Sequence, residues 1–198
     1  GGVGSWCAEE LARTGYADMT LADFDYVELS NINRQTQALI NTVGSHKTEA
    51  LLTRLKHINP EGRFESICRR FSADTADSFK LGEYDFVVDA IDSVADKAQL
   101  ILSVLENSRA KLFSSMGAAL RFDPSRVKSS AFKKVAGDGL ARALRQHFKK
   151  TGFFPPRDFT CVWSDESPCK CGIRASLMPV TAAFGLKLAS LIIDASRN

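Results

Sequence analysis

The first four residues, Gly-Gly-Val-Gly, form a glycine-rich run directly before a predicted helix over residues 4–15. The free N–H groups and the dipole of a helix N-terminus bind a phosphate. Glycine is required there because a side chain would hold the phosphate away from the backbone. Taken alone, the run also fits a tight turn or a flexible terminus. The strand that should aim such a loop is expected before Gly1, outside this sequence.

Asp23 strengthens the nucleotide interpretation. It ends a predicted strand over residues 19–23, about twenty residues after the glycines, where a carboxylate accepts hydrogen bonds from ribose hydroxyls. Asp25 falls on the same side of an extended chain. The alternative is a loop acid that caps a turn. Glycines and an acid fit a dehydrogenase as well as an enzyme that adenylates its substrate.

The next segment separates these two classes because it adds cations. Arg34 lies in a polar run over residues 28–37, and Lys47 follows at the start of the next predicted helix. An enzyme that attacks the α-phosphate of ATP must stabilise charge as pyrophosphate leaves, which guanidinium and ammonium groups do. The fork of Arg34 suits the β- and γ-phosphates, and Lys47 suits the α-phosphate as a point charge. The alternative is a solvated loop.

Two further acids close an apolar strand predicted over residues 84–90. Asp89 and Asp92 would emerge at the carboxyl edge of a parallel sheet, where α/β proteins bind ligands. A carboxylate there can hold the Mg²⁺ that bridges ATP phosphates, and we assign that role to Asp92. Asp89 either shapes the loop or caps the next helix, or it is a second metal ligand.

Six motifs in this order resemble the ubiquitin-activating-enzyme-like (ThiF-type) superfamily, which includes the adenylating enzymes of thiamin and molybdopterin sulfur carriers. They are Gly-Gly-Val-Gly, Leu-Ala-Asp-Phe-Asp, Ser-Asn-Ile-Asn-Arg-Gln, Gly-Ser-His-Lys, Ile-Asn-Pro and Asp-Ala-Ile-Asp-Ser. The resemblance implies that members adenylate a carboxylate and are typically dimers. It puts Gly2 and Gly4 at the phosphates and Asp23 on the ribose, and Asp92 on the metal. The triphosphate would be surrounded by Asn31, Arg34, Gln35 and Lys47.

The cysteines weaken the sulfur-carrier branch of this superfamily. That branch usually has two Cys-x-x-Cys pairs that hold structural zinc, a spacing suited to tetrahedral chelation. This sequence offers Cys169-Lys170-Cys171 and no second pair. Structural zinc is therefore not expected.

A basic segment points to a nucleic acid instead. Residues 126–157 contain nine Lys and Arg residues and one acid, Asp138. Such density beside an ATP site favours phosphate contacts with a polyanion, although charged helices are often only solvated. We predict RNA contacts from Lys133, Lys134, Arg142, Arg145, Lys149 and Lys150. Phe153 and Phe154 could stack on an unpaired base, but the sequence favours a role in anchoring the loop.

The same region resembles the tRNA threonylcarbamoyladenosine dehydratases, in the stretches around residues 132–145, 161–166 and 181–185. The resemblance implies an enzyme that uses ATP to activate the threonyl carboxylate of the modified adenosine beside the anticodon. An internal nitrogen or oxygen would then close a ring and release AMP. Cys161 is placed where thioester-forming relatives carry a nucleophile, so it is a candidate catalytic residue. A structural cysteine is the alternative, because cyclisation needs no enzyme thiol.

The elements that must position these residues alternate along the chain. Helices are predicted over residues 4–15, 48–58, 97–107, 140–150 and 180–195, and strands over 19–23, 63–68, 84–90, 112–115, 127–132 and 161–163. Alternation predicts an α/β, Rossmann-like, mostly parallel sheet with flanking helices, plus antiparallel pairing near residue 127. Residues 1–120 would form the ATP-binding region. Residues 121–198 would add the basic helix, the substrate side and a final core helix of the same domain.

Composition does not decide the functional class, but it bears on the cellular compartment. A chain of 198 residues with 44% apolar and 25% charged residues is ordinary for a globular domain. No stretch approaches the roughly 20 apolar residues of a membrane span, and five cysteines do not make a disulfide framework. We expect a cytoplasmic homodimer that uses ATP, Mg²⁺ and tRNA. The alternatives are adenylation of a ubiquitin-like sulfur-carrier protein, and a nucleotide-sensing scaffold without catalysis.

Overall fold

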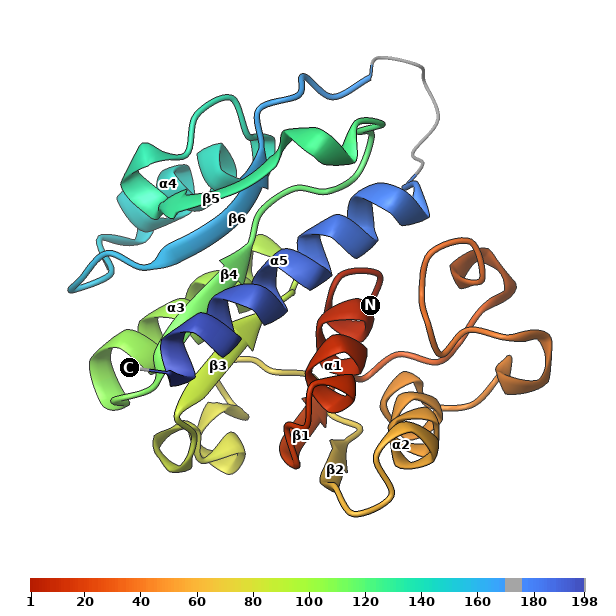
Figure 1. Cartoon of the computed structure of the whole chain (residues 1–198). Helices are drawn as coiled ribbons and strands as arrows, with labels where there is room; N and C mark the ends of the chain where they lie inside the picture. The colour runs from red at the N-terminus through yellow and green to blue at the C-terminus, as the bar shows by residue number, and fades with distance from the viewer. Residues whose placement is uncertain (170–175, 198) are drawn as a thin grey trace.

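The computed structural model describes residues 1–169 and 176–197 as an α/β protein (Figure 1). Its long helices are α1 (Gly4–Arg13), α2 (Lys47–Ile58), α3 (Val94–Asn107), α4 (Gly139–Thr151) and α5 (Met178–Ser196). Its strands are β1 (Asp18–Ala22), β2 (Arg63–Ile67), β3 (Phe86–Asp89), β4 (Lys111–Ser115), β5 (Val127–Ala131) and β6 (Thr160–Ser164). Each predicted helix and strand is confirmed within a few residues.

The strands form two hydrogen-bonded sheets. β1 pairs with β2 in parallel, and a second sheet has the order β3-β4-β6-β5. Within it, β3, β4 and β6 are parallel, and β5 runs antiparallel to β6 with Val127 opposite Ser164. The predicted mostly parallel sheet and its antiparallel partner are confirmed. The division into two sheets was not predicted; the Tyr84 hydroxyl, which donates to Thr20 Oγ1 at 3.0 Å, links them through side chains.

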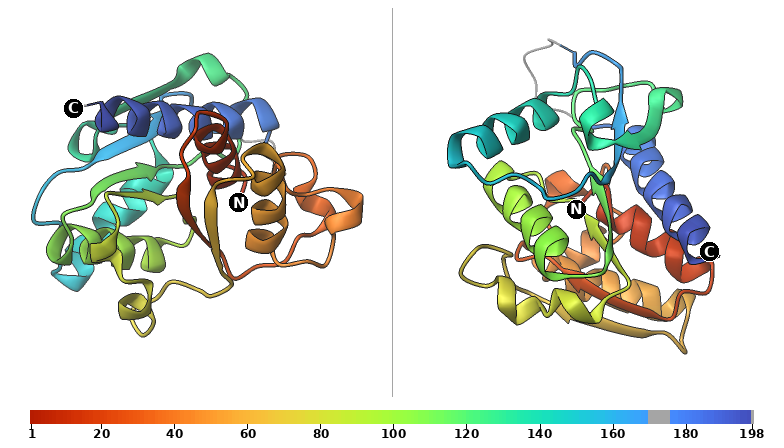
Figure 2. Two further views of the ribbon diagram at one scale, coloured as in Figure 1. Left: turned by 60° about the horizontal axis from the view of Figure 1, so that its bottom comes forward. Right: turned by 90° about the vertical axis from the view of Figure 1, so that its left-hand side faces the viewer.

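Helices cover both faces of the larger sheet, as the right-hand view of Figure 2 shows. Successive residues of a strand point to opposite faces. On β4, Leu112 therefore joins the core under α3 and α4, whereas Phe113 joins the core under α1 and α5. On β6, Cys161 and Val162 divide in the same way. β4 and β6 carry apolar residues on both faces because helices cover both faces of this sheet.

α5 departs from one expectation of the sequence. It is a 19-residue helix, and by length and composition it is apolar enough to cross a membrane. Eight of its residues are buried, however, including Val180, Phe184 and Leu188, which pack against Cys7 and Leu11 of α1. The contact is close at Gly185, where an added Cβ would lie 2.6 Å from the Val3 carbonyl oxygen.

Candidate functional site

The glycine run lies at the N-terminal end of α1, beside the residue that follows β1. Gly1 begins the run, and its backbone nitrogen lies 3.3 Å from the Asp23 carboxylate. Asp23 Oδ1 also accepts a hydrogen bond from the Asp25 amide at 3.0 Å, which fixes the turn after the strand. Asp23 therefore caps this turn through Oδ1, as one alternative predicted, and its ribose role stays a prediction.

Arg34 packs directly on the glycine run. A Cβ added to Gly2 would lie 3.3 Å from Arg34 Cγ and 3.5 Å from the Thr181 methyl of α5. Any larger residue at position 2 would therefore displace the arginine or the helix. The Arg34 guanidinium donates to the Ser30 carbonyl at 2.7 Å and to Asn33 Oδ1 at 2.9 Å.

The loop that carries Arg34 is tied to both helices behind it. The Trp6 indole of α1 donates to the Arg34 carbonyl at 2.9 Å, and Asn33 Nδ2 donates to the Ser176 carbonyl before α5 at 3.1 Å. The arginine backbone is thus fixed while its guanidinium stays partly exposed. This is the arrangement that charge stabilisation without reorganisation requires.

Asn31 and Gln35 support this loop from inside. Both are 5% exposed. Asn31 Oδ1 accepts from the Glu28 amide at 3.3 Å, and Gln35 Oε1 accepts from Gln37 Nε2 at 2.9 Å. Asn31 therefore supports the backbone just before Arg34, whereas Gln35 is bonded to the Gln37 side chain. Their contact with the triphosphate stays a prediction.

Lys47 begins α2 and is held by an acid. Its ammonium lies 2.6 Å from the Asp25 carboxylate, and its side chain is 11% exposed. The Lys47 amide donates to the Asp25 carbonyl at 3.0 Å, which joins the same two residues through the backbone. Lys47 is therefore close to the Asp23 turn, but a phosphate would have to compete with Asp25 for its charge.

Asp89 and Asp92 have different environments at the carboxyl end of β3. Asp89 is fully buried, lies 2.7 Å from the Lys97 ammonium and accepts from the Ser114 hydroxyl at 2.5 Å. Lys97 in turn donates to the Ile91 carbonyl at 2.9 Å. Asp89 and Lys97 thus clamp the loop, which supports the loop-shaping role predicted as one alternative for Asp89.

Asp92 is the exposed carboxylate of that loop. None of the hydrogen bonds or ion pairs within the described ranges involves it, so its oxygens are available to a cation. Its loop is next to the glycines, because a Cβ added to Gly4 would lie 3.5 Å from the Ala90 Cβ. One carboxylate with free coordination sites suits Mg²⁺, which keeps waters and phosphate oxygens as its other ligands.

Glycines 2 and 4, Asp23, Arg34, Lys47 and Asp92 are therefore gathered around one end of α1 by five different elements. The sequence matches a known protein family over nearly its entire length: residues 1–196 align with the ThiF family. The chain belongs to the ThiF family.

Relatives of this ThiF-family chain include two named tRNA threonylcarbamoyladenosine dehydratases. The one from Bacillus subtilis (strain 168) is 36% identical, and the match covers 85% of this chain and 65% of the relative. The one from Haemophilus influenzae is 34% identical, and the match covers 98% of this chain and 82% of the relative. Among solved structures, the Escherichia coli tRNA N6-threonylcarbamoyladenosine dehydratase in complex with ATP has a TM-score of 0.89. Its sequence is 35% identical to this one, and the match covers all of this chain and 85% of the Escherichia coli chain. The fold is therefore Rossmann-like, as predicted.

The cysteine considered as a nucleophile lies inside the sheet. Cys161 on β6 is fully buried in the core with Ile101 and Leu144. Burial raises the pKa of its thiol well above the usual range. Because the thiolate is the nucleophile, this environment favours the structural alternative for Cys161. Cys171 lies outside the described residues; no three His, Cys, Asp or Glu side chains gather into a metal-holding group within the described ranges.

The predicted RNA-binding cations differ in what they do. Lys133, Lys134, Arg142, Lys149 and Lys150 are exposed. Arg145 instead donates to the carbonyls of Phe132 and Val135 at 2.7 and 2.8 Å, and its guanidinium lies 4.8 Å from the Phe132 ring. Arg145 therefore ties α4 to the chain after β5, and only part of its charge faces solvent.

The sequence did not predict a buried ion pair at the start of α4. The Arg121 guanidinium is 2.7 Å from Asp138, with side chains 1% and 0% exposed, and it also donates to the carbonyls of Gly117 and Ser164. Asp138 caps α4 by accepting from the Ala141 amide at 2.9 Å. One signal was available: Asp138 is the single acid of a basic stretch and precedes a helix start.

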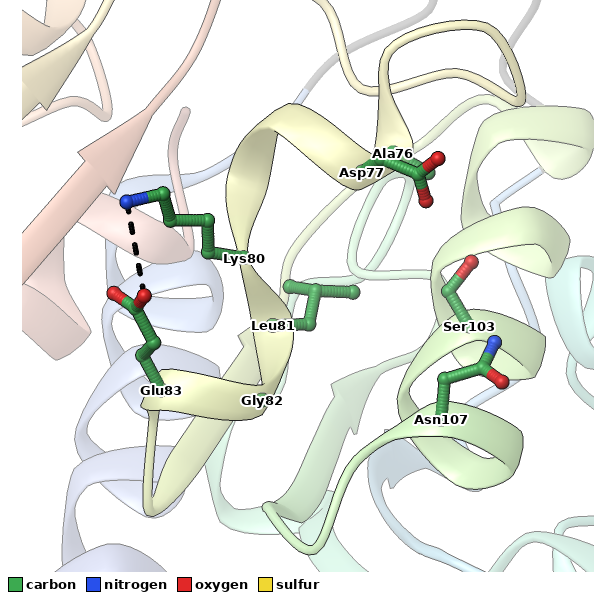
Figure 3. Close-up of a pocket in the computed structure, with 8 residues that line it drawn as sticks. All are labelled: Ala76, Asp77, Lys80, Leu81, Gly82, Glu83, Ser103 and Asn107. Atoms are coloured by element: carbon green, nitrogen blue, oxygen red, sulfur yellow. Dashed lines mark ion pairs between the residues drawn. The ribbon is translucent and has the colours of Figure 1, made fainter.

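A hollow of about 350 Å³ lies at the opposite edge of the sheet (Figure 3). Leu81 and Glu83 precede β3, and Asn107 ends α3 before β4, so this hollow is at the amino ends of the strands. The polar face described above is at their carboxyl ends, where α/β folds bind ligands. The hollow is therefore not the candidate site.

Proposed function

We propose that this chain is an ATP-dependent tRNA threonylcarbamoyladenosine dehydratase, which adenylates the threonyl carboxylate of the modified adenosine next to the anticodon. The observation that carries the proposal is the 0.89 TM-score to a dehydratase that holds ATP. It is supported by Arg34, Asp23 and Asp92 around the glycine run, because a scaffold without catalysis would have no need of all three.

The proposed reaction has two steps. A substrate carboxylate oxygen attacks the α-phosphorus of ATP, and the bond to pyrophosphate breaks. An internal nitrogen or oxygen of the modification then attacks the activated carbonyl carbon, and AMP leaves with the former carboxylate oxygen. The substrate has lost the elements of water. Arg34 would stabilise the β- and γ-phosphates, and Lys47 would exchange Asp25 for the α-phosphate. Gly2 and Gly4 would allow the phosphates to approach α1.

Asp92 would hold Mg²⁺. When bound, the ion would neutralise charge on the phosphate oxygens and favour loss of pyrophosphate. Asp23 would accept hydrogen bonds from the ribose, with Asn31 and Gln35 acting through the loop that presents Arg34. Residues 1–120 would then form the ATP-binding region, and 121–198 the substrate side.

The tRNA would be bound by the exposed cations of the basic segment. Their phosphate contacts would release counterions and make binding weaken with salt. A tRNA substrate also implies a cytoplasmic enzyme.

The second partner we propose is another copy of this chain. The segment between β1 and α2, at the right of Figure 1, extends away from the sheets. Its apolar side chains are exposed, by 67% at Leu29, 47% at Leu39, 76% at Ile40 and 40% at Val43. Exposed apolar side chains in one segment are typical of a homodimer interface.

The test uses purified protein, ATP, Mg²⁺ and tRNA that bears the threonylcarbamoyl modification. We expect AMP release and a nucleoside that has lost one water, measured by mass spectrometry. No AMP and an unchanged nucleoside would contradict the proposal. Pyrophosphate exchange that requires a carrier protein ending in Gly-Gly would instead indicate the sulfur-carrier alternative.

A further inference from the structure

Two phenylalanine side chains stand in solvent after α4. Phe153 and Phe154 are 65% and 60% exposed. The sequence favoured a role in anchoring the loop, and this exposure shows that the two rings do not anchor it in the core. α4 ends at Gly152 in a left-handed conformation (φ 76°), which reverses the chain. Pro155 and Pro156 follow and restrict the backbone. The rings are therefore held outward by a stiff connection.

Phe154 also borders a hollow with an aromatic floor. The hollow has a volume of about 370 Å³, and Lys133, Arg145 and Arg157 contribute to its walls. In its floor, Phe132 is stacked on Phe159 with ring centroids 4.8 Å apart and an angle of 16° between the rings. The Arg145 guanidinium lies 4.8 Å from the same Phe132 ring, on a helix fixed by two carbonyl contacts. Phe132 and Phe159 are 8% and 6% exposed, so this buried stack supports the hollow from below, and Phe154 is the exposed ring at its border.

Cations surround the exposed rings. Lys149 and Lys150 end α4 and are exposed. The acid within residues 126–157, Asp138, is buried against Arg121 and contributes little negative charge to the surface. Asp158 lies 3.6 Å from the Lys133 ammonium, so it offsets one cation of the rim. The net field around the rings is positive.

We infer that Phe153, Phe154 and this hollow, here named the aromatic platform, stack an unpaired nucleotide of the RNA substrate. Base–aromatic stacking accepts any base because each has a π-face, and neighbouring Lys residues meet its phosphates. The inference rests on the proposed function, since it concerns the same tRNA. Positive charge beside exposed rings matches an RNA loop, which presents bases and phosphates together.

The aromatic platform contacts a nucleotide other than the one that reacts. It precedes β6 and follows β5, which places it at the amino edge of the parallel strands. Asp89 and Asp92 are at the carboxyl edge. The loop between α4 and β6 accordingly lies at the left edge of Figure 1, away from the N-terminus. The aromatic platform therefore contributes to substrate affinity without touching the reacting atoms.

A second copy of the chain fits this surface less well. A symmetric dimer places the same patch of each copy against the other. Lys149, Lys150 and Lys133 would then face their own counterparts, and like charges across an interface are unfavourable.

The test compares Phe154→Ala and Phe154→Trp with Phe122→Ala, an aromatic control that is 52% exposed elsewhere. The probe is a fluorescent anticodon stem–loop RNA, and its affinity is measured by anisotropy at fixed salt. We expect Phe154→Ala to weaken binding about 5- to 150-fold, the range for losing one stacked base. Phe154→Trp should restore binding, and Phe122→Ala should not change it. Lys149→Ala should lower the salt slope by about 1, which Phe154→Ala should not do.

Turnover of modified tRNA gives the second measurement. Phe154→Ala should raise KM and leave kcat unchanged, and the mass of each variant in light scattering should equal that of the wild type. Unchanged RNA affinity in Phe154→Ala overturns the inference, as does a change of oligomeric mass. A wild-type protein that does not cyclise the nucleoside refutes the proposed function separately, whether or not Phe154 contributes to RNA affinity.

Discussion

At the scale of single residues, Arg34 offers the most direct test of the chemistry. Its guanidinium packs on Gly2 while its backbone is held by Trp6. Arg34→Ala should lower AMP formation by about 100- to 1000-fold, as loss of one donor to a developing charge does elsewhere. Arg34→Lys should retain part of the rate, because it keeps the charge and loses the fork.

Arg13→Ala provides the control for Arg34. Arg13 is also on the N-terminal part of the chain, but its side chain is 53% exposed and pairs with Glu9. Single-turnover AMP release should be unaffected by that change. Equal rates for Arg34→Ala and the wild type would remove Arg34 from the catalytic set.

The cysteines make a second prediction at this scale. Burial raises the pKa of Cys7 to about 12 and that of Cys161 further, whereas Cys68 is exposed. Iodoacetamide should therefore alkylate native Cys68 and leave Cys7 and Cys161 unmodified until the protein unfolds. Peptide mass spectrometry after a timed reaction measures this, with urea-unfolded protein as the reference.

Turnover measurements test whether the Cys161 thiol takes part in catalysis. Cys161→Ala should keep kcat within about threefold of the wild type while it lowers the free energy of unfolding, since it removes a buried sulfur. Loss of turnover in a folded Cys161→Ala protein, or rapid alkylation of native Cys161, would restore the nucleophile hypothesis.

Sequence could identify the chemistry of individual residues better than their contacts. Asp23, Arg34 and Asp92 could be selected as candidates because their types and spacing suit ribose, phosphate and metal, and the structure brings them to one end of α1. The pairing of Lys47 with Asp25, and the inward position of Asn31 and Gln35, depend on how a polar loop folds on itself. The exposure of Phe153 and Phe154 likewise follows from the path of one loop, which an aromatic pair does not encode.

At the scale of elements, the contact between α1 and α5 should couple stability to ATP binding. A Cβ at Gly185 would lie 2.6 Å from both the Val3 carbonyl oxygen and the Trp6 Cβ. Gly185→Ala must therefore separate the helices, at a cost of about 1–3 kcal/mol in unfolding free energy. Because α1 begins at the glycine run, ATP affinity should fall as well.

Gly139→Ala is the matched helical control. A Cβ at Gly139 meets nothing within 4 Å. Since alanine loses less backbone entropy than glycine in a helix, that variant should be as stable as the wild type or more so. Urea unfolding and isothermal titration with ATP measure both effects. A Gly185→Ala protein of unchanged stability would show that the helices can move apart freely.

The elements themselves were predictable because apolar runs and capping residues are local signals. The long-range contacts that join the elements were not predictable. Arg121 reaches Asp138 and the Ser164 carbonyl, partners 17 and 43 residues away. Lys97 likewise meets Asp89 only because α3 folds back over β3. Each is a long, charged side chain that sequence statistics place on the surface, and its burial depends on a partner that only the tertiary fold provides.

At the scale of the whole molecule, Ile40 tests the proposed homodimer. It is 76% exposed among other apolar side chains of the extended segment. If this surface is covered by a second copy, Ile40→Asp should give a monomer and Ile40→Leu should retain the dimer, because only the aspartate buries a charge. Light scattering over a range of concentrations measures the mass. A wild-type monomer at all concentrations would contradict the prediction.

The hydrogen bond from Trp6 to the Arg34 carbonyl has a practical consequence. The chain has two tryptophans, and the other, Trp163, lies in the core under α3 and α4. In a Trp163→Phe protein, all indole emission would come from a ring that is hydrogen-bonded to the loop expected to contact the triphosphate. The molecule thus carries its own optical reporter of nucleotide engagement. Stopped-flow fluorescence on that single-tryptophan variant could time ATP binding without an attached dye.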